Sequence, residues 1–242
     1  MKDWKSFLYE QYVSSGQSGV IENKYAESLQ SARHYSHYLI KHFLPADRNA
    51  QVIDLGCGTG AFIYYAQKAG FAHVSGVEIS DEQIAVAHSH GLDCIEKGDI
   101  LDYLQSLKPV SVNTFLLKDV IEHLTREELF TLVQLITEKL EPNGRVIIHV
   151  PNAGGIFGSK IRYADLTHEM AFTSQSIRQL FRSFGYKKVI VREDQPIVHG
   201  LKSLVRFLLW KILTLPFRLL HLAESGTFKI ELSQNLTAVA ER

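Results

Sequence analysis

The stretch Val52–Gly60 has the sequence VIDLGCGTG, an apolar run that ends in an acid and continues into three glycines at alternate positions. A strand that runs into a glycine loop and then into a helix forms a ligand-binding crevice in an open α/β sheet. Glycine permits positive φ and lets a ligand lie against bare backbone. The nonapeptide therefore predicts a ligand site in the loop that follows a strand.

The spacing of the glycines separates two classes of ligand. Dinucleotide-binding loops need G-x-G-x-x-G, whereas this chain has G-x-G-x-G with Asp54 two residues ahead of it. A carboxylate at that place would repel a pyrophosphate. The loop therefore favours a ligand group that is positively charged or donates hydrogen bonds.

Strand-like and helix-like segments alternate through the chain. Residues 1–44 have the apolar spacing of helices, which Pro45 ends. Further helices are expected, between strands, at 60–70, 80–91, 125–140 and 173–185. This alternation predicts an α/β fold with a mostly parallel sheet covered by helices on both faces.

Composition limits the class of protein. The 242 residues are 45% hydrophobic, which is enough for one sizeable core. Lys plus Arg and Asp plus Glu both count 26, so a nucleic-acid partner, which needs a basic excess, is not expected. Two cysteines and a charged N-terminus without signal-peptide character indicate a cytoplasmic protein. We expect one domain over 1–242, with a helical cap (1–50), a core (51–198), an insert (199–226) and a last strand (227–242).

Two acids stand at the ends of the next strands. Glu78 lies where an acid can accept hydrogen bonds from both hydroxyls of a ribose, with a surface glutamate as the alternative. Asp99 could accept from an adenine amino group while Ile100 packs on the ring. A helix cap is the alternative for Asp99.

Five stretches, VIDLGCGTG, GVEIS, GDI, LLKDVIEHL and LEPNGRVIIHVPN, resemble in order and spacing the motifs of class I S-adenosylmethionine-dependent methyltransferases over residues 51–152. The resemblance implies a Rossmann-like, seven-stranded sheet whose last strand is antiparallel, with S-adenosylmethionine rather than NAD as cofactor. It puts Asp54 near the methionine ammonium. The other cofactor residues it implies are Gly56, Gly58, Gly60, Glu78, Ile79, Asp99, Ile100, Lys118 and Arg33. Arg33 resembles an arginine that holds the cofactor carboxylate in related enzymes, and a solvated helix face is its alternative.

Methyl transfer needs a positioned acceptor and, for a hydroxyl, a base. Asp119 and His123 in DVIEHL would share one face of a helical turn. Similar stretches occur in ubiquinone-biosynthesis O-methyltransferases. His168, in the loop IRYADLTHEMAFT, is a second candidate base, and structural roles are the alternatives for both histidines. The clustered acids and His123 could also bind a divalent metal, but with no second ligand group at a defined spacing we assign no metal ligands.

The segment 199–226 is rich in Leu, Phe and Trp, carries Lys and Arg, and has no acid before Glu224. It is too charged to span a bilayer comfortably, and Pro216 is expected to divide it into two helices. Contact of 199–222 with a membrane surface, a lid over the acceptor and an oligomer interface are the alternatives.

These observations predict an S-adenosylmethionine-dependent methyltransferase that methylates a sugar hydroxyl of a polysaccharide or lipid-linked glycan, at the inner face of the membrane. DLTHEMAFTSQSIRQLFRSFGY resembles methyltransferases of bacterial polysaccharide and glycolipid pathways. A quinone precursor or small phenol as acceptor, and a non-catalytic cofactor-binding scaffold, are the alternatives.

Overall fold

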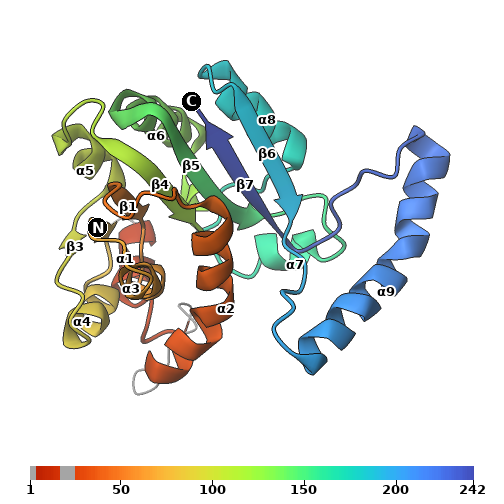
Figure 1. Cartoon of the computed structure of the whole chain (residues 1–242), viewed down its shortest axis with the longest axis horizontal. Coiled ribbons are helices and arrows are strands. Elements are labelled where there is room, and N and C mark those ends of the chain that lie inside the picture. The colour runs from red at the N-terminus through yellow and green to blue at the C-terminus, as the bar shows by residue number, and fades with distance from the viewer. Residues whose placement is uncertain (1–3, 17–24) are drawn as a thin grey trace.

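The computed structural model describes residues 4–16 and 25–242 (Figure 1). Within these residues, seven strands form one sheet in the order β3-β2-β1-β4-β5-β7-β6. The strands are β1 (Val52–Leu55), β2 (Val74–Glu78), β3 (Ile95–Lys97), β4 (Val112–Lys118), β5 (Leu140–Pro151), β6 (Lys188–Glu193) and β7 (Asn235–Glu241). Strands β1 to β5 pair in parallel, whereas β7 runs antiparallel to β5 and β6. The predicted Rossmann-like sheet with an antiparallel last strand is confirmed.

Helices cover both faces of the sheet. One face packs against α2 (Tyr25–Phe43), α3 (Ala61–Lys68) and α4 (Asp81–Ser89), and the other against α5 (Ile100–Ser106), α6 (Arg126–Lys139) and α8 (Ser174–Ser183). Side chains alternate along β1, so Val52 belongs to the first core and Ile53 and Leu55 to the second. Asp54 therefore lies on the same face as Val52, on the side of α2 and α3.

Helix ends follow their sequence signals. The Thr125 hydroxyl accepts from the Glu128 N–H and the Glu128 carboxylate accepts from the Thr125 N–H, a capping box that begins α6. Thr173 caps α8 in the same way. Gly70 and Gly91 follow α3 and α4 with φ of 91° and 78°, a conformation that glycine adopts without strain.

The N-terminal cap departs from the expected run of helix. α1 spans Trp4–Glu10 and α2 begins at Tyr25, while residues 11–16 form turns. The helical prediction is therefore wrong at 11–16, and its residues 1–3 and 17–24 lie outside the described residues. The reason is a competing acceptor: the N–H groups of Val13 and Ser14 donate to the Glu82 carboxylate at 2.7 and 3.1 Å.

Between β6 and β7 lies α9 (Leu201–Ser225), the outermost helix on one side of the molecule (Figure 1). The prediction that Pro216 divides this segment is wrong, because α9 is one helix with Pro216 inside it. Pro216 is exposed, so the carbonyl that loses its hydrogen bond is not enclosed in an apolar core. Two residues on, the Arg218 guanidinium holds α9 to the Glu193 carboxylate at 2.6 and 2.8 Å.

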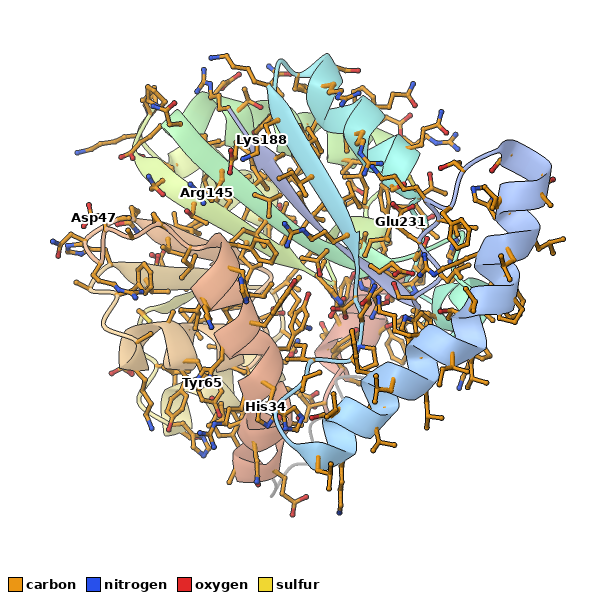
Figure 2. All side chains as sticks on the ribbon, turned by 45° about the vertical axis from the view of Figure 1, so that its right-hand side comes forward. His34, Asp47, Tyr65, Arg145, Lys188 and Glu231 are labelled. Carbon is orange, nitrogen blue, oxygen red and sulfur yellow. The ribbon has the colours of Figure 1, made fainter. Side chains whose placement is uncertain are left out.

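The start of α9 is tied to α2. The rings of His199 and His34 stack with centroids 3.5 Å apart, and Figure 2 shows His34 next to this end of α9. Two short helical segments, η1 (Ile121–His123) and α7 (Gly158–Arg162), lie in the loops after β4 and β5. Across residues 4–16 and 25–242, no helix is both long and apolar enough to cross a bilayer.

Candidate active site

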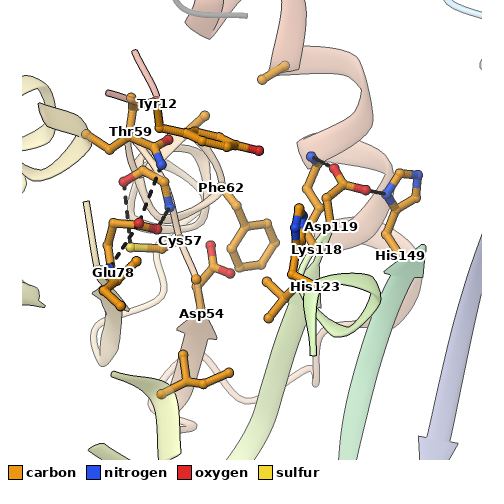
Figure 3. Close-up of a pocket in the computed structure, with 18 of the residues that line it drawn as sticks. Tyr12, Asp54, Cys57, Thr59, Phe62, Glu78, Lys118, Asp119, His123 and His149 are labelled. Atoms are coloured by element: carbon orange, nitrogen blue, oxygen red, sulfur yellow. Dashed lines mark hydrogen bonds and ion pairs between the residues drawn. The ribbon is translucent and has the colours of Figure 1, made fainter. Parts of the chain in front are cut away.

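A cavity of about 900 Å³ lies at the carboxyl ends of β1, β2 and β4 (Figure 3). The strand order reverses between β1 and β4, the place where open α/β sheets bind ligands. Most of the residues predicted to hold the cofactor line this cavity: Asp54, Gly56, Gly58, Glu78, Ile79, Asp99, Ile100 and Lys118. The fold thus brings together side chains that are far apart in sequence.

The three loop glycines divide into two kinds. Gly56 and Gly58 line the cavity, with φ of 72° and 57°. Gly60 does not line it; it precedes α3 with φ of 76°, and a Cβ there would lie 2.6 Å from Leu92 and 2.7 Å from Ile95. Gly60 is therefore required by the turn and by packing against two buried side chains, rather than by an open approach to the cavity.

Asp54 is a buried acid with an unused oxygen. Its side chain is 3% exposed, and Oδ1 has no hydrogen-bond partner within the part of the chain that the structure describes. Burial raises the pKa of Asp54 to about 7, an effect that Lys118 opposes and Glu78 reinforces. A cationic donor in the cavity would satisfy this oxygen and stabilise the ionised carboxyl.

Glu78 is held by the backbone. Its Oε1 accepts from the N–H groups of Ile79 and Ser80 at 3.0 and 2.9 Å, and its Oε2 accepts from the Gly58 N–H at 2.9 Å. Burial raises the pKa of Glu78, and these backbone hydrogen bonds lower it. The carboxylate therefore fixes the glycine loop to the end of β2, and Oε2 keeps acceptor capacity toward the cavity.

Two predicted contacts take different positions. The Asp99 Oδ1 accepts from the N–H groups of Leu101 and Asp102 at 2.7 and 3.4 Å, so Asp99 caps α5 while it also lines the cavity. Arg33 is exposed and does not line the cavity. The cavity face of α2 consists of Ser28, Ser31, Ala32, Tyr35, Ser36 and Leu39.

A chain of charged groups follows β4. Asp119 has a φ of 57°, forms an ion pair with Lys118, and accepts from the His149 Nδ1 at 2.5 Å. The His149 Nε2 lies 3.3 Å from Asp194 Oδ2. Burial alone would lower the pKa of His149, but the two carboxylates raise it to about 9. His149 and Asp194 were not identified from the sequence. The only signal was His149 itself, a single histidine in the apolar strand GRVIIHV.

The N-terminal helix covers part of the cavity. Lys5 of α1 donates to the His123 carbonyl at 2.8 Å and pairs with Glu169 at 3.3 Å. Tyr12 donates to Asp165 Oδ2 at 3.0 Å, and both Lys5 and Tyr12 line the cavity. Sequence reasoning described this segment as a cap but did not identify these residues.

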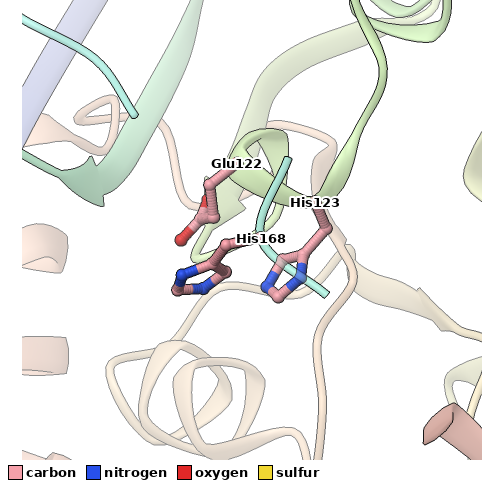
Figure 4. A group of neighbouring side chains, drawn as sticks. All are labelled: Glu122, His123 and His168. Carbon is pink, nitrogen blue, oxygen red and sulfur yellow. The ribbon is translucent and has the colours of Figure 1, made fainter. Parts of the chain in front are cut away.

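The two candidate bases are neighbours, but His123 lines the cavity and His168 does not. The rings of His123 and His168 lie with centroids 4.6 Å apart, and Figure 4 shows both beside the Glu122 carboxylate. Burial lowers the pKa of His123 to about 4, with the neighbouring His168 adding to the effect, so its ring is neutral at pH 7. His123 and the third predicted catalytic residue, Asp119, both line the cavity. Asp119 precedes η1 with a left-handed backbone and pairs with His149, so the predicted helical turn with one shared face is not formed.

The fold and the site define a methyltransferase. A family profile described as "Methyltransferase domain" matches residues 25–191, more than half of the chain, and the chain belongs to this family. The resemblance to methyltransferases inferred from the five motifs is confirmed.

Curated relatives match only part of the chain. Ribosomal protein L11 methyltransferase of Shewanella piezotolerans is 30% identical over 102 residues, which cover 42% of this chain and 33% of that protein. Ubiquinone biosynthesis O-methyltransferase of Xylella fastidiosa is 29% identical over 110 residues, covering 43% of this chain and 42% of that one. The matched stretch therefore spans less than half the length of either relative.

Solved structures share the fold over much more of the chain. A SAM-dependent methyltransferase from Archaeoglobus fulgidus superposes with a TM-score of 0.65 at 20% identity, covering 99% of this chain and 100% of that one. Phosphoethanolamine N-methyltransferase 2 of Haemonchus contortus, solved with S-adenosyl-L-methionine, has a TM-score of 0.60 at 20% identity and covers 86% of this chain and 51% of that one. These similarities establish the fold.

Proposed function

We propose that this protein transfers a methyl group from S-adenosylmethionine to a sugar hydroxyl of a polysaccharide or lipid-linked glycan. The main observation in favour of this cofactor is the buried Asp54 carboxyl, which lines the cavity below the glycine loop. Its Oδ1 has no hydrogen-bond partner among the described residues. An α-ammonium group donates to such an oxygen, and a dinucleotide pyrophosphate would be repelled by it.

In this proposal the cofactor lies along the carboxyl ends of the strands. Gly56 and Gly58 pack against its methionine part, and the backbone of Lys118 lies beside it. Glu78 accepts from the ribose through Oε2, which now has one donor, the Gly58 N–H. Ile79 and Ile100 enclose the adenine, near Asp99. Arg33 is exposed and stays outside this set.

The acceptor lies between the cofactor and α1, beside Tyr9, Tyr12 and His123, which line that part of the cavity. The hydroxyl oxygen forms a bond to the methyl carbon as the sulfur–carbon bond breaks and its electron pair stays on sulfur. The hydroxyl proton passes to Nε2 of His123, which lines the cavity. The His123 ring is neutral at pH 7, so it can accept this proton, and its pKa of about 4 makes it a weaker base than an ordinary histidine.

The composition of α9 supports a lipid-linked acceptor. The stripe that faces the protein is Ser203, Phe207, Trp210, Thr214 and Arg218, whereas most of its leucines face outward. Exposed large apolar side chains include Leu208, Leu209, Ile212, Leu213 and Leu220. A helix that presents apolar side chains to solvent needs another partner for that face.

Charge favours an anionic bilayer surface as that partner. Lys202, Arg206 and Lys211 are exposed among the apolar residues of α9, and Glu224 is the first acid, near its end. Cationic side chains bind lipid phosphates while the apolar side chains enter the interface. In this proposal α9 holds the enzyme at the inner face of the membrane, where a lipid-linked glycan would be available.

Isotopically methyl-labelled S-adenosylmethionine tests the acceptor. The purified protein is incubated with a lipid and glycolipid extract of its host, and the labelled products are identified by mass spectrometry. Label on a sugar hydroxyl of a lipid-linked glycan is expected. Label on a quinone precursor would replace this acceptor with a phenol, in line with the ubiquinone biosynthesis relative. Tight cofactor binding with no label in any extract would favour the scaffold alternative.

A further inference from the structure

We propose that Glu122, His123 and His168 bind one divalent cation of the first transition row, through a carboxylate oxygen and the Nε2 atoms of the two imidazoles. One candidate ligand atom from each residue lies within 4.8 Å of the other two. Figure 4 shows the carboxylate and both rings facing one another. Proximity alone is not sufficient, and the hydrogen bonds around each side chain supply the argument.

Hydrogen bonds to Thr167 and Asp165 fix the tautomer of His123. Its Nδ1 lies 2.8 Å from the Thr167 hydroxyl, and that hydroxyl donates its one hydrogen to Asp165 Oδ1 at 2.6 Å. Asp165 also accepts from the Thr167 N–H at 2.8 Å and from Tyr12, so it acts as an acceptor throughout. The Thr167 oxygen must therefore accept from Nδ1–H, which leaves a lone pair on Nε2.

His168 is arranged in the same way. Its Nδ1 lies 3.2 Å from the Arg162 carbonyl, and a carbonyl oxygen can only accept. Nδ1 therefore carries the proton and Nε2 carries the lone pair. Histidines that bind metals characteristically donate the other ring N–H to a carbonyl, or toward a carboxylate, in this manner.

Glu122 supplies the negative charge. Its side chain is 1% exposed, and Oε2 is buried without a hydrogen-bond partner among residues 4–16 and 25–242. Burying an unpaired carboxylate is costly, and a bound cation would offset that cost. The Glu122 carbonyl accepts from the N–H groups of Glu169 and Met170 at 2.8 and 3.0 Å, which holds the His168 loop beside η1. The three ligands are thus set in place by the backbone.

Two imidazoles and one carboxylate favour ions such as Mn²⁺, Fe²⁺ or Co²⁺ over Mg²⁺ and Ca²⁺, which prefer oxygen ligands alone. Three protein ligands leave coordination positions open. Because His123 lines the cavity, an acceptor hydroxyl could occupy one of them, and a bound cation would lower the pKa of that hydroxyl. This role rests on the proposed function, whereas binding of the cation does not. In the cation-bound enzyme the two histidines would act as ligands and not as bases, because the cation holds their Nε2 lone pairs.

Cobalt titration tests the site. The full-length protein is stripped with a chelator and titrated with Co²⁺, followed by visible absorption and calorimetry. We expect one equivalent to bind, Glu122→Gln and His168→Ala to abolish binding, and Thr167→Val, which removes the acceptor behind His123, to weaken it about 10–100-fold. His73→Ala, at an exposed histidine that precedes β2 at the amino end of the strand, is the matched control and should bind like the wild type.

S-adenosylmethionine affinity, measured on every variant, reports on folding and keeps the two proposals separate. Failure of the wild type to bind Co²⁺ or Mn²⁺, or equal binding by Glu122→Gln and His168→Ala, would overturn the cation site and leave the methyltransferase proposal untouched. Cation binding with no methyl transfer to any acceptor would leave the site standing and remove the proposed reaction.

Discussion

The Nδ1 atom of His149 lies 2.5 Å from Oδ1 of Asp119, and the opposite ring nitrogen lies 3.3 Å from Asp194. An imidazole with a carboxylate on each side is bound best as a cation. The pair of His149 and Asp119 joins the carboxyl end of β5 to the residue after β4, at the edge of the proposed cofactor site.

The stability of the protein should therefore depend on the charge of His149. Its pKa is about 9 in the folded protein against an ordinary value of about 6.5, so its contribution is complete below pH 6.5 and is lost as the pH rises through 9. Allowing for screening of the partly exposed Asp119, we expect His149→Gln to cost about 2 kcal/mol at pH 6 and little at pH 9.5. Urea denaturation at the two pH values measures this, and a cost that is equal at both would contradict it.

Cofactor affinity should rise with pH through Asp54. Its pKa is about 7 in the free protein, so the carboxylate that attracts the ammonium is formed only as the pH passes 7. We expect the Kd of S-adenosylmethionine to fall between pH 5.5 and 7.5. Asp54→Asn should raise the Kd about 10–100-fold at pH 7.5 and remove the pH dependence, since a hydrogen bond to a charged group is worth about 1.5–3 kcal/mol. Asp93→Asn, at an exposed acid, is the control and should change neither.

The two histidines should affect turnover rather than cofactor binding. We expect His123→Ala or His168→Ala to lower kcat by about two to four orders of magnitude, with the Kd of S-adenosylmethionine unchanged. Steady-state assays with the acceptor that the labelling experiment identifies provide kcat. Near wild-type rates in both variants would remove both residues from the chemistry.

The outward face of α9 should carry membrane binding. Ile212 and Leu213 are 64% and 67% exposed, so replacing both with Asp should leave the melting temperature almost unchanged. The same change should abolish flotation with anionic vesicles by opposing both the apolar and the electrostatic attraction. Lys108→Glu, an exposed charge reversal on a loop away from α9, should float normally. Dimerisation of the wild type through α9 with no vesicle binding would assign this face to a second copy of the chain.

A side chain at Gly60 should destabilise the fold. Its φ of 76° strains any other residue, and a Cβ would lie 2.6 Å from Leu92. We expect Gly60→Ala to destabilise the fold by about 1–3 kcal/mol. Gly16→Ala has open space around it and a similar φ of 78°, so it isolates the contribution of packing from that of backbone strain.

The sequence was sufficient for the sheet and for most of the cavity, because both depend on local signals. Glycine spacing, acids at or near the carboxyl ends of β1 to β4 and capping residues such as Thr125 act over a few residues. Arg33 shows the limit: helical periodicity does not say which face of α2 meets the cavity, and the answer depends on packing against α3.

Contacts between residues far apart in the chain could not be predicted from the sequence. Glu122 and His168 come together only because the loop after β5 folds back on η1 through two backbone hydrogen bonds. Pro216 predicted a break because its local effect is disruptive, but Arg218 and Glu193 hold the helix across that point.

Consecutive residues at the end of β6 face different parts of the molecule. The Glu193 carboxylate accepts a hydrogen bond from Arg218 of α9, and the Asp194 carboxylate contacts His149 beside the cavity. Two adjacent residues therefore connect β6 to α9 on one side and to the cavity on the other. A shift of α9 relative to the sheet must either move the backbone at 193–194 or break the ion pair between Arg218 and Glu193. Movement of that backbone would change the distance from Asp194 to His149, so the position of α9 is coupled to the charges beside the cavity.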